Sequence, residues 1–351
     1  MELQSSPFLC LLRAGLWNLP PEGSCFEHLT DDDWAEIIDQ ARAHSVQALI
    51  ADGLGLVPES SRPSLQKTAA LALATEAVEQ GNCKVEAVLK QMAAFWAKQG
   101  VTAVLLKGQG LAGMYAIPKH RTPGDIDWYF PGEENYSKAL SLVRSKGFDP
   151  KEDSDGDCHY GVGGVLVEHH KRWCNLSSPF KQRSVAIIEK QYGYSQGQDY
   201  TIPAPLTNLV QLNVHILKHM LVLGVGWRQF CDLAIATGHY SGRYSTEDYR
   251  NAIESLGLMR WTRLLYGVLA KFLGVDPASL PVEPVTGKDV DRLAELIMRC
   301  GNFGRASGKG MLASYMASAS LLFRYAPGEV LWRPARLARN RLDLIIKRKR
   351  D

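Results

Sequence analysis

Two short apolar runs flank a segment of glycines, cations and acids that restricts how this chain folds. Lys107 and Gly108 follow the first run, residues 101–106, and Asp125-Ile-Asp127 opens the second, Trp-Tyr-Phe. If the second run is a strand, its period of two places both aspartates on one face. The alternative is a pair of ordinary surface acids after the Thr-Pro-Gly turn. The segment favours metal-assisted chemistry on a nucleoside triphosphate, because Mg²⁺ takes one or two carboxylates together with substrate phosphates.

A third acid lies on another strand-like run. Glu168 ends the apolar part of residues 165–170, and residues 159–164 are the expected hairpin partner. Glu168 either completes a carboxylate cluster or faces solvent at a strand end, and the spacing alone leaves both open. His169 and His170 suggest a transition metal, but no second histidine or cysteine pair with zinc-like spacing exists. An oxygen-ligand site for Mg²⁺ or Mn²⁺ is therefore expected.

Periodicity divides the chain into three parts. Residues 1–98 are expected to be a helical region, with one long or broken helix over 64–100. Residues 99–203 mix strands with a helix over 136–146, for which Asn135 is a plausible N-cap. Residues 204–351 are almost wholly helical in pattern. The predicted class is α+β, a small mixed-sheet core flanked by N-terminal and C-terminal helical regions.

The central segment also matches two other motifs. Gly108-x-Gly-x-x-Gly113 matches the dinucleotide fingerprint, but Pro118 interrupts the helix and Asp125 arrives before a second strand. Asp-x-Asp also occurs in glycosyltransferases that use Mn²⁺ and a nucleotide sugar. There the pair normally follows a long apolar strand, whereas here it follows Arg-Thr-Pro-Gly.

The motifs together resemble a known family. Leu105-Leu-Lys-Gly-x-x-Leu-Ala-x-x-Tyr115, then Pro118, Arg121 and Asp125-Ile-Asp127, then Val-Glu-His and Trp227-Arg-x-x-x-Asp232 are similar to the uncharacterised nucleotidyltransferase family of the DNA polymerase beta superfamily. The similarity spans roughly residues 30 to 240. It implies a metal-bound NTP and transfer of an NMP group to an acceptor. That acceptor, whether a small molecule, sugar, peptide or protein, is not indicated.

The resemblance assigns roles to individual residues. Asp125, Asp127 and Glu168 would bind the metal and carry catalysis. Lys107 and Gly108 stand where the superfamily usually has Gly-Ser, so phosphate contact would come from the ammonium, backbone amides or Arg121. The missing serine keeps open a nucleotide-binding regulatory protein without turnover.

In the helical region after residue 203, His219, Arg228 and Asp232 would face the cleft by resemblance. The sequence offers simpler readings for all three. His215 and His219 lie one turn apart, as residues on a polar helix face do. Arg228 and Asp232 are also one turn apart, which favours an intrahelical ion pair.

Composition fits a cytoplasmic globular protein. The 351 residues are 46% hydrophobic and carry a net charge of +3, which gives no strong nucleic-acid signal. The seven cysteines form no Cys-x-x-Cys and fit reduced thiols. The basic stretch 331–351 is expected to pack its apolar stripe on the domain, with weak contact to an anionic membrane surface as the alternative.

Overall fold

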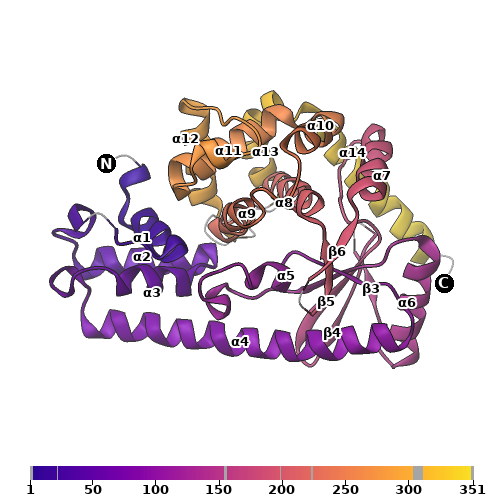
Figure 1. Ribbon diagram of the computed structural model, residues 1–351, viewed down its shortest axis with the longest axis horizontal. Helices are drawn as coiled ribbons and strands as arrows, with labels where there is room; N and C mark the ends of the chain where they lie inside the picture. The colour runs from indigo at the N-terminus through magenta and orange to yellow at the C-terminus, as the bar shows by residue number, and fades with distance from the viewer. Residues whose placement is uncertain are drawn as a thin grey trace.

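The computed structural model describes residues 3–21, 23–153, 156–197, 199–222, 224–302 and 311–348. It confirms the α+β class: a mixed five-stranded sheet and a small hairpin are surrounded by helices (Figure 1). The helices are α1 Pro7–Trp17, α2 Asp31–His44, α3 Gln47–Gly55, α4 Leu65–Lys98, α5 Gln109–Ala112, α6 Glu133–Ser145, α7 Gln182–Tyr192, α8 Pro205–Met220, α9 Trp227–His239, α10 Thr246–Leu256, α11 Met259–Leu273, α12 Lys288–Cys300, α13 Met311–Tyr325 and α14 Pro327–Arg348.

The sheet brings two strands from distant parts of the sequence together. Its order is β1-β2-β5-β4-β3, in which only β2 and β5 are parallel. The strands are β1 Val104–Leu106, β2 Ile126–Tyr129, β3 Lys151–Glu152, β4 Cys158–Val162 and β5 Val165–His170. The hairpin of β6 Tyr194–Gln196 and β7 Thr201–Pro203 packs beside β1. Because β1 and β2 are antiparallel and α5 has only four residues, the βαβ unit of a dinucleotide fold is absent here.

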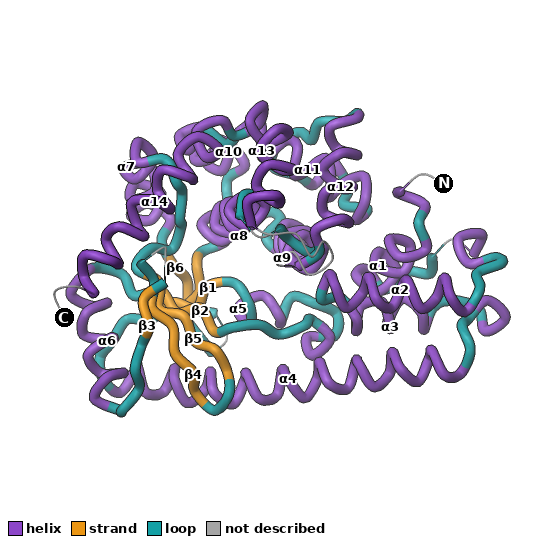
Figure 2. Tube along the Cα trace, turned by 180° about the vertical axis from the view of Figure 1, so that it is seen from behind, coloured by secondary structure: helices purple, strands orange, loops and turns teal. Residues whose placement is uncertain are grey.

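Helix α4 connects the two hydrophobic cores. Its 34 residues extend about 50 Å at ~1.5 Å each. Leu71 belongs to the larger core, which α4 shares with the N-terminal and C-terminal helices. Val85 to Trp96 carry a buried stripe that packs with β1, β2, β5 and α6 in the smaller core. The helix therefore runs along one side of the molecule, beneath α1–α3 at one end and the sheet at the other (Figure 2).

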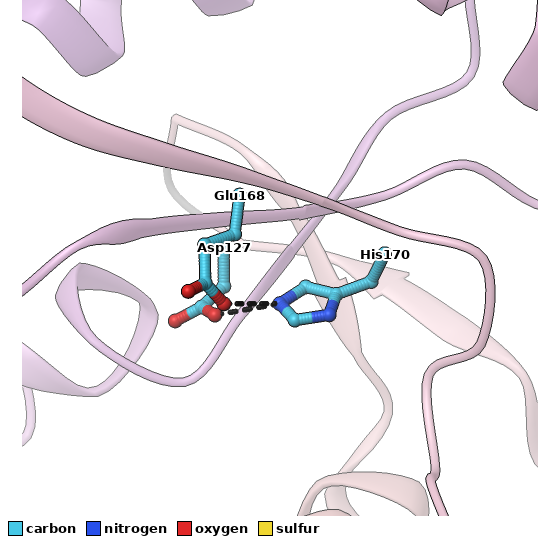
Figure 3. A group of neighbouring side chains, drawn as sticks. All are labelled: Asp127, Glu168 and His170. Atoms are coloured by element: carbon cyan, nitrogen blue, oxygen red, sulfur yellow. Dashed lines mark hydrogen bonds and ion pairs between the residues drawn. The ribbon is translucent and has the colours of Figure 1, made fainter. Parts of the chain in front are cut away.

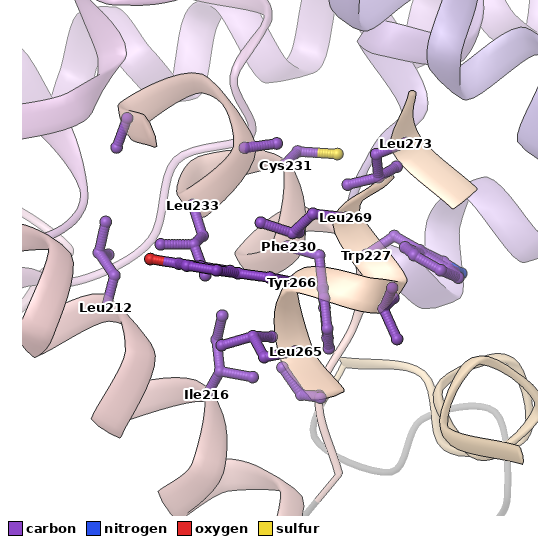
Figure 4. Packing of buried hydrophobic residues seen from close by; sticks show 14 of the residues in the cluster. Leu212, Ile216, Trp227, Phe230, Cys231, Leu233, Leu265, Tyr266, Leu269 and Leu273 are labelled. Atoms are coloured by element: carbon purple, nitrogen blue, oxygen red, sulfur yellow. The ribbon is translucent and has the colours of Figure 1, made fainter. Parts of the chain in front are cut away.

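The C-terminal helices form the wall opposite α4. Figure 4 shows side chains of α8, α9 and α11 interdigitating in their shared core. Trp227, Phe230, Tyr266 and Leu269 are wholly buried there. The apolar faces of these helices are therefore used for packing, and polar residues of α8 and α9 lie toward the sheet. No helix among the described ranges is both long and apolar enough to cross a membrane.

Most of the basic stretch near the C-terminus lies in helix α14. Val330 and Arg333 are buried, and Arg336 donates to the carbonyl of Leu176. Leu331 is exposed, and Trp332 stacks edge-on against Phe180. The side chains of residues 340–348 and all of 349–351 lie outside the described part of the chain. The contacts of the first two turns agree with a helix that packs on the domain.

Candidate active site

Parallel pairing of β2 and β5 builds a carboxylate cluster. The register places Asp127 directly opposite Glu168 on the neighbouring strand. His170, two residues beyond Glu168, lies on the same face of β5, and its Nε2 is 2.7 Å from Oδ1 of Asp127. Figure 3 shows the three side chains turned toward one another. One potential ligand atom from each lies within 4.8 Å of the others, a spacing compatible with a single metal ion.

Asp125 immediately precedes β2 and borders the same cavity as the cluster. Burial, followed by the charges of Asp127 and Glu168, raises the pKa of Asp125 to about 6. The three acids predicted from the sequence thus face one cavity. The structure adds His170 as a fourth member. Asp125 is not among the three residues, Asp127, Glu168 and His170, whose potential ligand atoms lie within 4.8 Å of one another.

His170 holds the cluster together as a donor. Its Nδ1 lies 2.9 Å from Oδ2 of Asp157, and its Nε2 lies 3.3 Å from Oε2 of Glu168 as well as close to Asp127. Burial alone would lower the pKa of His170, but Asp157 and the hydrogen bonds to Asp127 and Glu168 raise it well above its usual value. Because ionised carboxylates only accept hydrogen bonds, both ring nitrogens must carry protons. His170 is therefore an imidazolium between three acids.

Adjacent His169 takes no part in this cluster. It is completely buried on the opposite face of β5, where Nε2 pairs with the hydroxyl of Tyr160 at 2.7 Å. Burial lowers its pKa to about 3. The His-His pair is thus split between the core and the site, as the alternation of a strand requires.

Lys107 supplies a second positive charge to Asp127. Its Nζ lies 2.9 Å from the same Oδ1 that His170 contacts. Burial would lower the pKa of Lys107, but Asp127 and Asp125 raise it to about 12. Burial on its own would raise the pKa of Asp127, but the charges and hydrogen bonds of Lys107 and His170 hold that pKa well below its ordinary value. The ammonium is directed inward by an unusual turn, with φ of 49° at Lys107 and 47° at Gly108. A left-handed lysine costs about 1–2 kcal/mol, and such strain is typical of functional sites.

Arg121 and Asp232 form a buried ion pair across the cavity floor. The Nε and Nη2 atoms of Arg121 lie 2.7 and 2.8 Å from the two carboxylate oxygens of Asp232, which also accepts from Tyr115 at 2.7 Å. Arg228 donates instead to the carbonyls of Thr122 and Pro123. Arg228 and Asp232 therefore do not form the intrahelical ion pair that their spacing favoured. All three charged residues still border the cavity, and a phosphate contact by Arg121 stays a prediction.

His219 lies on α8 at the same cavity, one turn after His215. Their rings pack edge to face with centroids 4.3 Å apart. Burial first, and then the charges of Lys218 and Lys107, lowers the pKa of both imidazoles well below the usual value. The pair presents neutral rings to the cavity.

Asn82, which no motif predicted, positions the loop that leads to the acids. It is buried halfway along α4, and its Nδ2 lies 2.7 and 2.9 Å from the carbonyls of Lys119 and Arg121. Its Oδ1 accepts from Gln109 of α5 at 2.6 Å. A single asparagine thus joins the long helix to both segments that flank the glycine turn.

The cavity has a volume of about 770 Å³, within the range of small-molecule sites. Carboxylates occupy the sheet side, and cations and imidazoles of α8 and α9 face them. The oxygen-rich donor set fits a hard divalent cation such as Mg²⁺. Asp125, Asp127 and Glu168 are the residues that would hold it.

Carboxylates on the neighbouring strands β2 and β5 lie beside a glycine turn that carries an inward lysine, an arrangement suited to a divalent cation and phosphate. The chain belongs to the family described as uncharacterised nucleotidyltransferase, which it matches over residues 30–274. Neither the curated proteins nor the solved structures contain a match to the chain. The family match confirms the resemblance inferred from the motifs. The matched region ends at residue 274, whereas the motifs reached only to about residue 240.

Proposed function

We propose that this protein transfers an NMP group from an NTP to an acceptor in a reaction that depends on a divalent cation. The in-register pairing of Asp127 with Glu168, at the cavity that Asp125 and the Lys107–Gly108 turn also border, carries this proposal. Membership of the nucleotidyltransferase family supports the general class of reaction.

Each residue of the site has a role in the proposed reaction. Asp125 and Asp127 hold the cation, which when bound would neutralise phosphate charge and polarise the phosphoryl oxygens. Lys107 and the backbone amides of the Gly108 turn bind the triphosphate tail. The acceptor approaches from the α8 and α9 side and attacks the alpha phosphorus in line, so that pyrophosphate leaves. Glu168, whose side chain is 28% accessible, takes the acceptor proton.

We propose a role for Arg121 that differs from the phosphate contact predicted from the motifs. Two of its nitrogens already donate to Asp232, and the third donates to the carbonyl of Thr122. We therefore infer that Arg121 positions the loop before Asp125. Within the described part of the chain, the hydrogen-bond partners of Arg228 are backbone carbonyls, so Arg228 is the better candidate for a phosphate contact.

Transfer of label from alpha-³²P NTPs in cell extract tests the proposal without a known acceptor. The wild type should label a product in the presence of Mg²⁺, and Asp125→Asn and Asp127→Asn should abolish labelling. Asp149→Asn removes an exposed acid outside the cavity and should retain it. Because Asp127 also pairs with Lys107 and His170, thermal melting must show that its variant is folded; Asp125→Asn covers the case in which it is not.

Other outcomes of this assay point to other functions. Labelling that survives Asp127→Asn would contradict the metal role. Transfer from UDP-sugars but not from NTPs would identify a glycosyltransferase. Nucleotide binding without any labelled product would indicate a regulatory binder.

A further inference from the structure

The sulfur atoms of Cys10 and Cys25 are in direct contact, far from the cavity of the proposed active site. Sγ of Cys10, on α1, lies 2.7 Å from Sγ of Cys25, which belongs to the short 3₁₀ helix Gly23–Phe26. Both residues are thiols in the structure. A disulfide bond is about 2.05 Å long, so the two sulfurs have less than 1 Å left to travel. We propose that Cys10 and Cys25 are a redox-reactive pair that forms a reversible disulfide.

Packing holds both cysteines where their sulfurs meet. Phe26, next to Cys25, is buried and stacks on Trp34 of α2 with ring centroids 6.1 Å apart. Cys10 is 4% exposed and belongs to the same hydrophobic core as Phe26 and Trp34. Because the fold has already brought the two thiols together, a bond between them has the advantage of a well-oriented intramolecular reaction.

The surroundings give the two sulfurs different roles. Cys25 is half-buried and can be reached by a small oxidant, whereas Cys10 is buried. Nη2 of Arg13 lies 3.3 Å from Sγ of Cys10. A guanidinium beside a sulfur stabilises the thiolate, which is the attacking species in disulfide exchange. Cys25 is therefore the residue that meets the oxidant, and Cys10 is the residue that completes the bond.

A small disulfide such as glutathione disulfide serves as the oxidant. Sγ of Cys25 attacks one sulfur of glutathione disulfide, so that Cys25 carries one glutathione and the other leaves with the proton of Cys25. Sγ of Cys10 then attacks Sγ of Cys25, and the second glutathione leaves with the proton of Cys10. Two cysteine thiols are thus oxidised to one disulfide, while one glutathione disulfide is reduced to two thiols. Excess reduced glutathione reverses both steps.

Peptide mapping detects the bond directly. Trypsin cleaves after Arg13 and Arg42, which places Cys10 in peptide 1–13 and Cys25 in peptide 14–42. When the folded chain is incubated with glutathione disulfide and its remaining thiols are then blocked, the two peptides should be recovered as one linked species. Cys25→Ser should abolish the link. Cys83→Ser removes an exposed cysteine of α4 and should keep it.

The bond should also stabilise the fold. It joins residues 15 apart, and a closed loop of this size should raise the midpoint of thermal unfolding by about 4 °C in the wild type and in Cys83→Ser. Cys25→Ser should show no such rise. A linked wild type that melts at the midpoint of the reduced protein would overturn the stabilising effect.

The chain unfolded in urea is the reference for the contribution of the fold, since so short a separation also allows the link there. The folded chain should become half linked at a concentration of glutathione disulfide at least tenfold lower. Equal concentrations would overturn the inference. Glutathione attached to Cys25 without any linked peptide, or a Cys25 that does not react in the folded chain, would overturn it as well. The proposed transferase activity does not depend on any of these outcomes.

Discussion

The ion pair of Arg121 with Asp232 makes a strong prediction about stability. The two side chains are 4% and 6% accessible and are joined by two short hydrogen bonds. Asp232→Asn leaves a guanidinium buried without its counter-charge, which costs about 3–5 kcal/mol. A protein of this kind is stable by about 5–15 kcal/mol, so urea unfolding should shift to much lower midpoints. A loss below about 1 kcal/mol would refute the reasoning, since only exposed pairs are worth so little.

A double variant separates the two roles open to Arg121. Arg121→Met with Asp232→Leu replaces both charges by apolar groups, so it should recover part of the stability lost in Asp232→Asn, less the cost of the buried Tyr115 hydroxyl that loses its acceptor. If Arg121 only positions the loop, the double variant should bind the methylene analogue of ATP nearly as well as the wild type. A loss of tenfold or more, about 1.4 kcal/mol, would return Arg121 to the phosphate site.

Three further outcomes are expected. Gly15→Ala should lower the free energy of unfolding in urea by ~3 kcal/mol or more, because the new Cβ would lie 1.8 Å from the carbonyl oxygen of Leu49. Gly55→Ala is the control and should be close to neutral, since no atom lies within 4 Å of the added Cβ. Asn82→Ala should cost about 1–3 kcal/mol and weaken nucleotide binding, because it leaves the carbonyl of buried Arg121 without the amide of Asn82. Unchanged binding would show that the loop does not depend on Asn82. The affinity for Mn²⁺ should fall about tenfold per pH unit below pH 6, because protons then compete with the metal for Asp125. Asp125→Asn should remove this pH dependence. An affinity of the wild type that does not change with pH would contradict the raised pKa of Asp125.

Local patterns predicted the elements well where a single segment determines them. The helix expected over 64–100 is α4. The expected hairpin became β4 and β5. The N-cap at Asn135 was wrong, because α6 begins at Glu133 and Asn135 instead bonds the backbone of Thr102. A tertiary partner outweighed the capping preference there.

The site was predictable only in part, because its side chains are paired across distant segments. Asp127 and Glu168 could be matched by the family motif, and His170 was within reach, since the period of two puts it on the face of Glu168. Asp157 gave no such signal: in the sequence it ends an acidic turn, and only the β4–β5 pairing brings it to His170. The partner of Arg121 was likewise hidden, because Asp232 lies 111 residues away.

The N-terminal helices belong to the working site rather than to a separate support. His120 lies between Asp52 of α3, at 2.8 Å, and Glu79 of α4, at 3.2 Å, and the next residue along the chain is Arg121. One turn after Glu79, Asn82 holds the same loop by its carbonyls. Since this loop leads directly to Asp125, any shift of α3 against α4 would move that acid. The long helix thus couples the packing of α1–α3 to the geometry of the proposed active site.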